Sequence, residues 1–160
     1  MINTLELYNI GRFFRRKGLV SLSYFCEVLN RKLNRCAIYS ETIIGKGTTL
    51  AYGGIAIVIH RKAILGENCT ISQGVTIGRD PTLAHGVPSI GDNVYIGAGA
   101  VVFGDIHIGS NSIIAPNSIV NSDVEDHSIV GGIPAKLIKK IDSKSVSYQA
   151  YGVKLPTDDA

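Results

Sequence analysis

The residues best suited to chemistry stand where a regular repeat of the chain is interrupted. The first interruption, LAYGGIAIVIH at residues 50–60, contains Tyr52 and ends in His60. The second, RDPTLAHGVPS at residues 79–89, contains His85. The unperturbed pKa of histidine lies near neutrality, so either histidine could act as a general base that takes a proton from a hydroxyl group. Tyr52 could donate a hydrogen bond to a developing oxyanion.

Each of these residues also has a structural interpretation. His60 occupies a position where most repeats carry a small residue, so it points outward, either into a site or toward a backbone carbonyl of the corner. His85 is a base, a substrate ligand or a solvated loop residue, and Tyr52 is a donor, a pocket residue or an aromatic that fills the kink. His107 and His127 are predicted to be structural, and because the sequence has no HxxxxH pair, no metal site is expected.

The repeat itself has a period of six residues. The position after each leading aliphatic residue is usually glycine or another small residue, and the fifth is small or β-branched. This period is the signature of a parallel β-helix, in which three hexads form one triangular coil and coils stack about 4.8 Å apart. The aliphatic residues that lead the repeats, and that we expect to point inward, are Ile59, Leu65, Ile71, Ile77, Ile90, Ile96, Val102, Ile108, Ile114 and Val120.

The spacing of these leading residues locates two departures from the regular wall. Leu50 and Ile59 are nine positions apart, so YGG must bulge, and Gly53 and Gly54 supply backbone angles that a regular coil forbids. The next gap that is too long contains the loop 79–89. We expect the bulge to make room for a substrate beside His60, with the loop closing the site from the other side.

The two ends of the chain differ from the repeats. Residues 1–36 predict two helices, residues 37–131 the β-helix, and residues 132–160 an exit segment and tail, in which AKLIKKI is expected to form a short basic helix. The first 36 residues carry seven basic and two acidic side chains, a net +5, against +3 for the whole chain. This basic segment predicts either a peripheral contact with an anionic membrane or a solvated helical face. No nucleic-acid partner is predicted.

Composition limits the class of protein. One domain is expected for 160 residues, of which 45% are apolar, and no apolar run is long enough to span a membrane. The N-terminus lacks the features of a secretion signal. Cys26, Cys36 and Cys69 form no CxxC pair, which predicts buried, reduced thiols. The chain is therefore expected in the cytoplasm, with a peripheral position at the inner face of the membrane if the basic segment binds lipid.

Two motifs carry a family resemblance. IGDNVYIGAGAVV, followed by VGGIPAKLIKKI, resembles the hexapeptide-repeat acyltransferases, over roughly residues 37–141. Within them the chain resembles the serine acetyltransferase branch, and the YGGIAIVIH form is similar to members that acetylate capsule and lipopolysaccharide sugars. The resemblance implies an all-β fold, a left-handed parallel β-helix with a short N-terminal helical segment and a C-terminal helix or tail.

The resemblance also implies partners. Members are homotrimers with active sites between subunits and with acetyl-CoA, the co-substrate, lying along the coils. Its pantetheine would approach small residues, and its phosphates would meet lysines near the exit. The positions that match are Gly97, Ala98, Ala115, Lys136, Lys139 and Lys140.

One departure from the family determines the predicted acceptor. Serine acetyltransferases carry an Asp-His pair where this chain has Ala51 and Tyr52, which argues against serine. The sequence therefore predicts an O-acetyltransferase that acts on a sugar hydroxyl of a saccharide or lipid-linked glycan by direct transfer. The alternatives are a serine acetyltransferase, an N-acetyltransferase of amino-sugars, and a structural β-helix trimer without catalysis.

Overall fold

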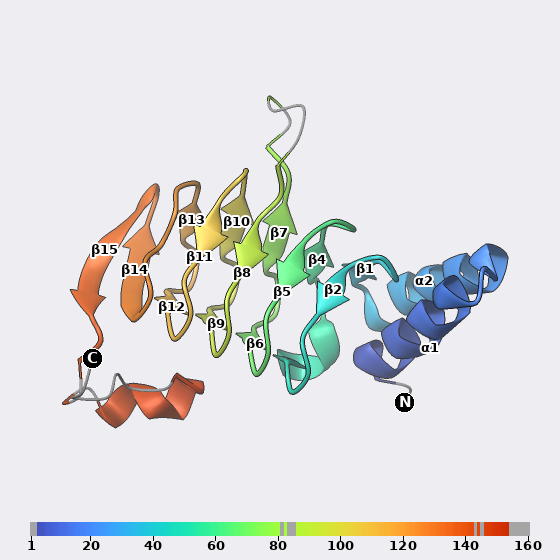
Figure 1. The fold of residues 1–160 in the computed structure, drawn as a ribbon, viewed down its shortest axis with the longest axis horizontal. Coiled ribbons are helices and arrows are strands. Elements are labelled where there is room, and N and C mark those ends of the chain that lie inside the picture. The colour runs from blue at the N-terminus through green and yellow to red at the C-terminus, as the bar shows by residue number, and fades with distance from the viewer. Residues whose placement is uncertain (1–2, 81, 83–85, 143, 145, 154–160) are drawn as a thin grey trace.

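A helical hairpin leads into a three-sided stack of short parallel strands, which an antiparallel pair closes at the far end (Figure 1). The computed structural model describes residues 3–80, 82, 86–142, 144 and 146–153. The chain winds through three sheets, whose strands are parallel except for the last pair, and forms a β-solenoid. This architecture is consistent with the predicted left-handed β-helix of hexapeptide repeats. The predicted fold class is therefore confirmed.

The three sheets form the sides of the prism. Sheet A contains β1 (Ala37–Ile38), β4 (Val58–Ile59), β7 (Thr76–Gly78), β10 (Val101–Phe103) and β13 (Ile119–Val120). Sheet B contains β2 (Ile43–Ile44), β5 (Ile64–Leu65), β8 (Ser89–Ile90) and β11 (His107–Ile108). Sheet C contains β3 (Thr49–Leu50), β6 (Thr70–Ile71), β9 (Tyr95–Ile96), β12 (Ile113–Ile114), β14 (Ser128–Gly132) and β15 (Ala135–Lys140).

The leading aliphatic residues fill the interior of the prism as predicted. All ten, from Ile59 to Val120, have exposed fractions between 0 and 3%. The strand register stacks them on one another, since Ile59 lies opposite Ile77 and Ile77 lies opposite Val102. Because each burial removes apolar surface from water and adds close packing, this continuous column is the main stabilising feature of the fold.

The three corners of the prism are not built alike. The corners from sheet B to sheet C and from sheet C to sheet A turn through a residue with positive φ, three positions after the leading residue, and that residue is usually Asn or Gly. These residues are Gly47, Gly53, Asn68, Gly74, Asn93, Gly99, Asn111, Asn117 and His127. The corner from sheet A to sheet B, here called the A–B corner, has no such residue at the corresponding described positions.

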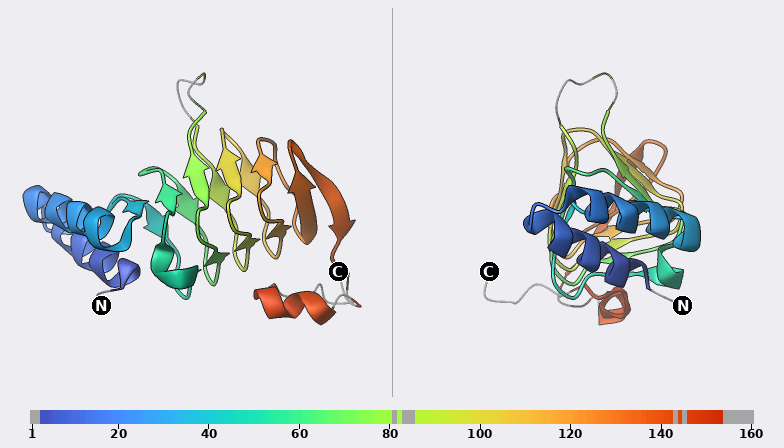
Figure 2. Two further views of the ribbon diagram at one scale, coloured as in Figure 1. Left: turned by 180° about the vertical axis from the view of Figure 1, so that it is seen from behind. Right: turned by 90° about the vertical axis from the view of Figure 1, so that its right-hand side faces the viewer.

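The N-terminal helices α1 (Thr4–Arg16) and α2 (Val20–Asn34) pack on each other at the first coil (Figure 2). Asn3 and Glu6 form a capping box that begins α1. The Tyr8 hydroxyl donates to the Thr42 carbonyl at 2.7 Å and ties α1 to the prism. The Thr4 hydroxyl donates to the carbonyl of Gly53. The hairpin therefore supports the bulge of the wall directly.

The predicted helix over AKLIKKI is wrong, because this segment is strand β15. It pairs antiparallel with β14, with Gly132 opposite Ala135 and Ser128 opposite Lys140. The unpaired edge of the last coil must be covered, and a strand satisfies its backbone groups whereas a helix would not. A 3₁₀ helix, η2 (Val146–Tyr151), then returns along sheet C, where Tyr151 contacts Tyr95 edge to face with ring centroids 4.8 Å apart.

The three cysteines are buried and free, as the sequence predicts. Burial is the main cause that raises the pKa of each thiol above its ordinary value. They are therefore unreactive core residues. None of the described helices is long and apolar enough to cross a membrane.

Candidate functional site

His60 lies at the A–B corner, directly after β4. Its backbone N–H donates to the Ile77 carbonyl at 2.8 Å, which fixes the residue to the next coil. Its ring Nδ1 accepts from the backbone N–H of Lys62 at 3.2 Å. A neutral ring whose Nδ1 accepts carries its proton on Nε2, so the free side of His60 is a hydrogen-bond donor. The structural interpretation of His60 predicted a backbone carbonyl as its partner, but the partner is the backbone N–H of Lys62.

The electrostatics keep this histidine neutral. Partial burial lowers the pKa of His60 below its usual 6.5, and the positive charges of Arg79, Arg61 and Lys62 lower it further. The lowered pKa therefore favours the uncharged form of the ring at pH 7. A neutral His60 ring can accept the hydrogen bond from the Lys62 N–H at Nδ1 and still donate through Nε2–H.

His60 lines a pocket of about 470 Å³ at the A–B corner. Its other lining residues are Arg61, Lys62, Arg79, Gly86, Val87 and Asp105. They come from three successive coils and from both ends of the loop 79–89. Gly86 approaches the neighbouring coil so closely that a Cβ there would lie 2.4 Å from Asp105 Cβ. His85 lies outside the described residues.

Tyr52 lies in the 3₁₀ turn η1 (Ala51–Gly54), the predicted bulge of the wall. Its backbone adopts positive φ (52°), as does Gly53 (70°). The Tyr52 side chain is 81% exposed, so it does not fill the kink, and the structural interpretation of this residue is wrong. A hydroxyl on an exposed ring at a strained turn is free to meet a ligand.

Tyr52 shares its corner with the small residues predicted to contact the co-substrate. Gly97 and Ala98 follow β9, and Ala115 follows β12, so all lie at the corner from sheet C to sheet A, here called the C–A corner. Gly97 is buried against the next coil, and a Cβ there would lie 2.6 Å from Pro116 N. Ala98 and Ala115 are partly exposed. The glycine is thus required by packing, and the alanines line the outer surface.

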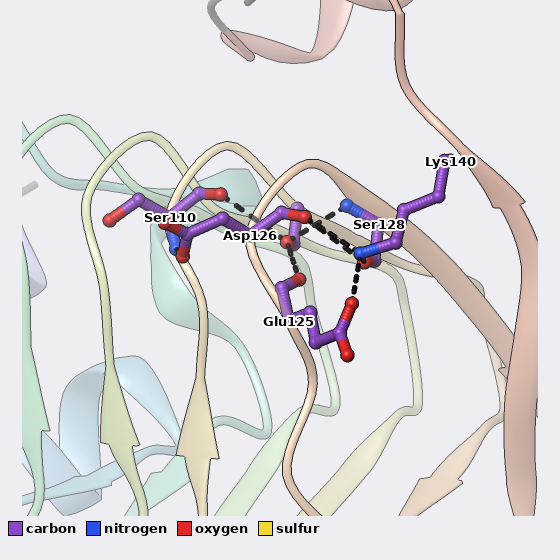
Figure 3. A network of polar contacts seen from close by, with 6 residues as sticks. Ser110, Glu125, Asp126, Ser128 and Lys140 are labelled. Carbon is purple, nitrogen blue, oxygen red and sulfur yellow. Dashed lines mark hydrogen bonds and ion pairs between the residues drawn. The ribbon is translucent and has the colours of Figure 1, made fainter. Parts of the chain in front are cut away.

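The lysines predicted to meet phosphates differ from one another. Lys140 Nζ lies 2.6 Å from Glu125 Oε2 and 2.9 Å from Ser128 Oγ, and it also contacts the Asp126 carbonyl (Figure 3). Its charge is therefore matched within the chain. Lys136 is exposed beside it and lines the same end pocket. Of the two, Lys136 is the better placed for an external anion.

The structure does not bring the predicted catalytic residues together in one chain. Tyr52 lies at the C–A corner, whereas His60 and the loop lie at the A–B corner, across sheet A. The expectation that the YGG bulge opens space beside His60 is therefore wrong within a single chain. The bulge is completed before β4, and His60 follows β4 at the next corner.

The cations around His60 were not predicted from the sequence. Arg61, Lys62 and Arg79 converge because consecutive coils stack at this corner, not because they form a local motif. The run HRK at a corner position was the available signal. Among the described residues no group of acidic, histidine or cysteine side chains could hold a metal ion.

Comparison with known proteins identifies the repeats. Residues 56–87 match the hexapeptide repeat of succinyl-transferase, and residues 88–122 match the bacterial transferase hexapeptide. A serine acetyltransferase from Staphylococcus aureus is 36% identical over 138 residues, which are 84% of this chain and 60% of that protein. Serine acetyltransferase 4 of Arabidopsis thaliana is 32% identical over 146 residues, 89% of this chain and 40% of that protein.

Solved structures give the same result. The serine acetyltransferase of Neisseria gonorrhoeae aligns with a TM-score of 0.80 at 33% identity, over 86% of this chain and 54% of that one. A Brucella abortus serine acetyltransferase in complex with coenzyme A aligns with a TM-score of 0.81 at 26% identity, over 85% and 54%. This chain thus spans about half the length of these relatives.

These comparisons decide between the branches considered from the sequence. The relatives named above are serine acetyltransferases, and the predicted placement closest to the polysaccharide O-acetyltransferases finds no support among them. The repeats and the prism agree with the hexapeptide-repeat models that match residues 56–122. The chain is similar over most of its own length to serine acetyltransferases, of which it spans about half.

Proposed function

We propose that this chain is an acetyl-CoA-dependent O-acetyltransferase of the serine acetyltransferase type. The observation that carries the proposal is the alignment of 86% of the chain with a serine acetyltransferase structure at a TM-score of 0.80 and 33% identity. A related structure is described as a complex with coenzyme A, which supports an acyl-CoA donor here.

The C–A corner supports the binding of the donor. Its outer surface carries the small side chains of Ala98 and Ala115, which leave backbone groups accessible to an extended pantetheine. Lys136 would meet the phosphates at the end of the prism, beside Lys140, whose charge is matched by Glu125. We assign acetyl-CoA to this corner.

A homotrimer would bring the two corners together. Sheet A separates the A–B corner from the C–A corner in one chain, so a site that uses both needs two subunits. A symmetric trimer repeats one such contact three times. In this arrangement Tyr52 and the donor of one subunit face His60 and the loop 79–89 of another.

The transfer needs a base and an oxyanion donor. The base removes the proton of the acceptor hydroxyl, whose oxygen forms a bond to the thioester carbon, and the carbon–sulfur bond then breaks to release CoA, which takes up a proton. Because His60 presents Nε2–H, we assign it the role of donor. The predicted base is then His85, and Tyr52 supplies a second hydrogen bond.

Two acceptors follow from different observations. The relatives favour serine. Ala51 and Tyr52 stand where the family resemblance implies an Asp-His pair, and they favour a different hydroxyl compound, such as the sugar predicted from the sequence. The experiment is to measure CoA release from acetyl-CoA with serine and with a panel of neutral and phosphorylated saccharides. Release with serine alone assigns the serine reaction, release with saccharides alone assigns the second candidate, and no release with any acceptor contradicts the proposal.

We also propose that the helical hairpin contacts anionic membrane surfaces. Phe13, Tyr24 and Phe25 are more than half exposed on it. Arg12 donates to the Thr42 carbonyl and Arg15 pairs with Glu41, so part of the basic charge is used within the chain. The remaining basic residues belong to the same hairpin as the exposed aromatic side chains, a composition typical of interfacial helices.

A further inference from the structure

The A–B corner differs from the other two corners of the prism in its turns and in the pocket beside His60. The other two corners close tightly through Asn or Gly with positive φ, whereas this corner leaves a pocket of about 470 Å³. At the corresponding position it carries Lys62, and the turn is held by the bond from the Lys62 N–H to His60 Nδ1. The corner is therefore built around the His60 ring.

The pocket carries more positive than negative charge. Arg61, Lys62 and Arg79 line it, and Asp105 is the acidic residue among its lining side chains. Arg61 lies over the Tyr39 ring, 4.8 Å from its centroid, and its Nε is 3.6 Å from Glu41 Oε2. Lys62 and Arg79 have no ion pair among the described residues. Two cationic side chains are thus available to a ligand.

The His60 ring lines the same pocket as these cations. Its Nδ1 is occupied by the Lys62 amide, and its Nε2–H is the donor assigned above to the transfer step, so the phosphate contacts are assigned to Lys62 and Arg79. Cationic side chains that form charge-assisted hydrogen bonds are the groups that bind phosphate in proteins. The His60 ring then reports on an anion bound beside it.

We propose that this pocket binds the phosphate group of a phosphorylated acceptor. Lys62 and Arg79, which have no ion pair among the described residues, can each contact an oxygen of one phosphate, whereas Arg61 is already paired with Glu41. The pocket lies at the A–B corner, apart from the C–A corner to which we assign acetyl-CoA, so the phosphate belongs to the acceptor rather than to the donor. The identification of the ligand as the acceptor rests on the proposed function, but the binding of phosphate does not.

The test is an NMR titration of the histidine ring signals of the full chain, with and without inorganic phosphate at constant ionic strength. Bound phosphate stabilises the imidazolium form, so the titration midpoint of His60 is expected to rise by about 1 pH unit. His107, exposed on sheet B, is the internal control. The dissociation constant is expected to be on the order of 1 mM.

Two variants that each remove one positive charge test whether the pocket, rather than the overall charge of the chain, binds phosphate. Arg79→Gln is expected to weaken phosphate binding about tenfold, because it removes a charge-assisted contact. Lys46→Gln removes an exposed positive charge at the corner between β2 and β3 and is expected to bind phosphate as the unsubstituted chain does. An unchanged His60 midpoint, an equal change at His107, or equal affinities of the two variants would overturn the phosphate site.

A further measurement distinguishes a phosphate of the acceptor from a phosphate of CoA as the ligand of the pocket. CoA added to the phosphate-bound protein is expected to leave the His60 shift in place, and loss of that shift would assign the pocket to the donor and overturn the acceptor. Acetyl transfer is measured separately. A chain that binds phosphate at His60 without transferring acetyl contradicts only the proposed function, and a chain that transfers acetyl without this response contradicts only the pocket.

Discussion

At the scale of single residues, the decisive feature is the hydrogen-bond state of His60. The Lys62 amide occupies Nδ1, which makes the ring a donor. We expect His60→Ala to lower the rate of acetyl transfer about 10²–10³-fold, as the loss of an oxyanion donor does. His60→Gln retains an N–H near the position of Nε2 and should recover about tenfold of that loss. If His60 were the base, Gln and Ala would reduce turnover equally, as measured by steady-state kinetics.

The charges beside His60 predict how its titration responds to substitution. The pKa of His60 is lowered first by burial and then by Arg79, Arg61 and Lys62, while the carboxylate of Asp105 lines the same pocket. We expect the ring to titrate below pH 6.5 and Arg79→Gln to raise its midpoint. Since the folded pKa is depressed, the ring adds stability above about pH 6.5 that is lost as pH falls through the folded value. A midpoint unchanged by Arg79→Gln in an NMR titration would contradict this electrostatic account.

At the scale of elements, close stacking of coils dictates which glycines are required. A Cβ on Gly97 would lie 2.6 Å from Pro116 N and 2.9 Å from the Ile114 carbonyl oxygen, both backbone atoms that cannot move aside. Gly97→Ala should therefore cost about 1–3 kcal/mol of stability. Gly78→Ala is the matched control, because its Cβ would meet only Thr76 Cγ2 at 3.8 Å. Thermal unfolding should separate the two variants, and equal melting temperatures would contradict this explanation.

The helical hairpin carries a prediction about surfaces. Phe13, Tyr24 and Phe25 are exposed beside the basic residues of α1 and α2. We expect the chain to sediment with anionic vesicles at low salt and to be released at high salt, because salt screens the attraction. Replacing Phe13 and Phe25 by serine should reduce binding at both salt concentrations. Equal sedimentation with neutral vesicles, or none with either kind, would contradict the proposed contact.

The helices, strands and loops also show how much of the fold can be predicted from the sequence. Periodicity located the buried residues, the bulge and the loop, because each coil repeats one local pattern of burial. It failed at β15, where an open sheet edge imposed strand pairing on residues with helical propensity. The cations of the pocket at the A–B corner were also missed. Lys62 and Arg79 are neighbours only because β4 stacks on β7, and no local pattern encodes that convergence.

At the scale of the whole molecule, the two half-sites predict complementation between subunits. His60→Ala damages the A–B corner, whereas Ala98→Arg would block the proposed donor surface of the C–A corner. If each site uses the A–B corner of one subunit and the C–A corner of another, co-expressed variants form some sites with both corners intact. For random mixing in equal amounts these are about a quarter of all sites.

The expected result is therefore acetyl transfer at about a quarter of the unsubstituted rate from the co-expressed mixture, well above the rate of either variant alone. Mixing the separately purified variants without subunit exchange is the control and should restore nothing. If one chain supplied the complete site, both corners would never be intact in the same chain, and the co-expressed mixture would be as inactive as its parts. Mass measurement of the mixed assembly checks that trimers containing both variants have formed, so a lack of activity in such trimers would contradict a site shared between subunits.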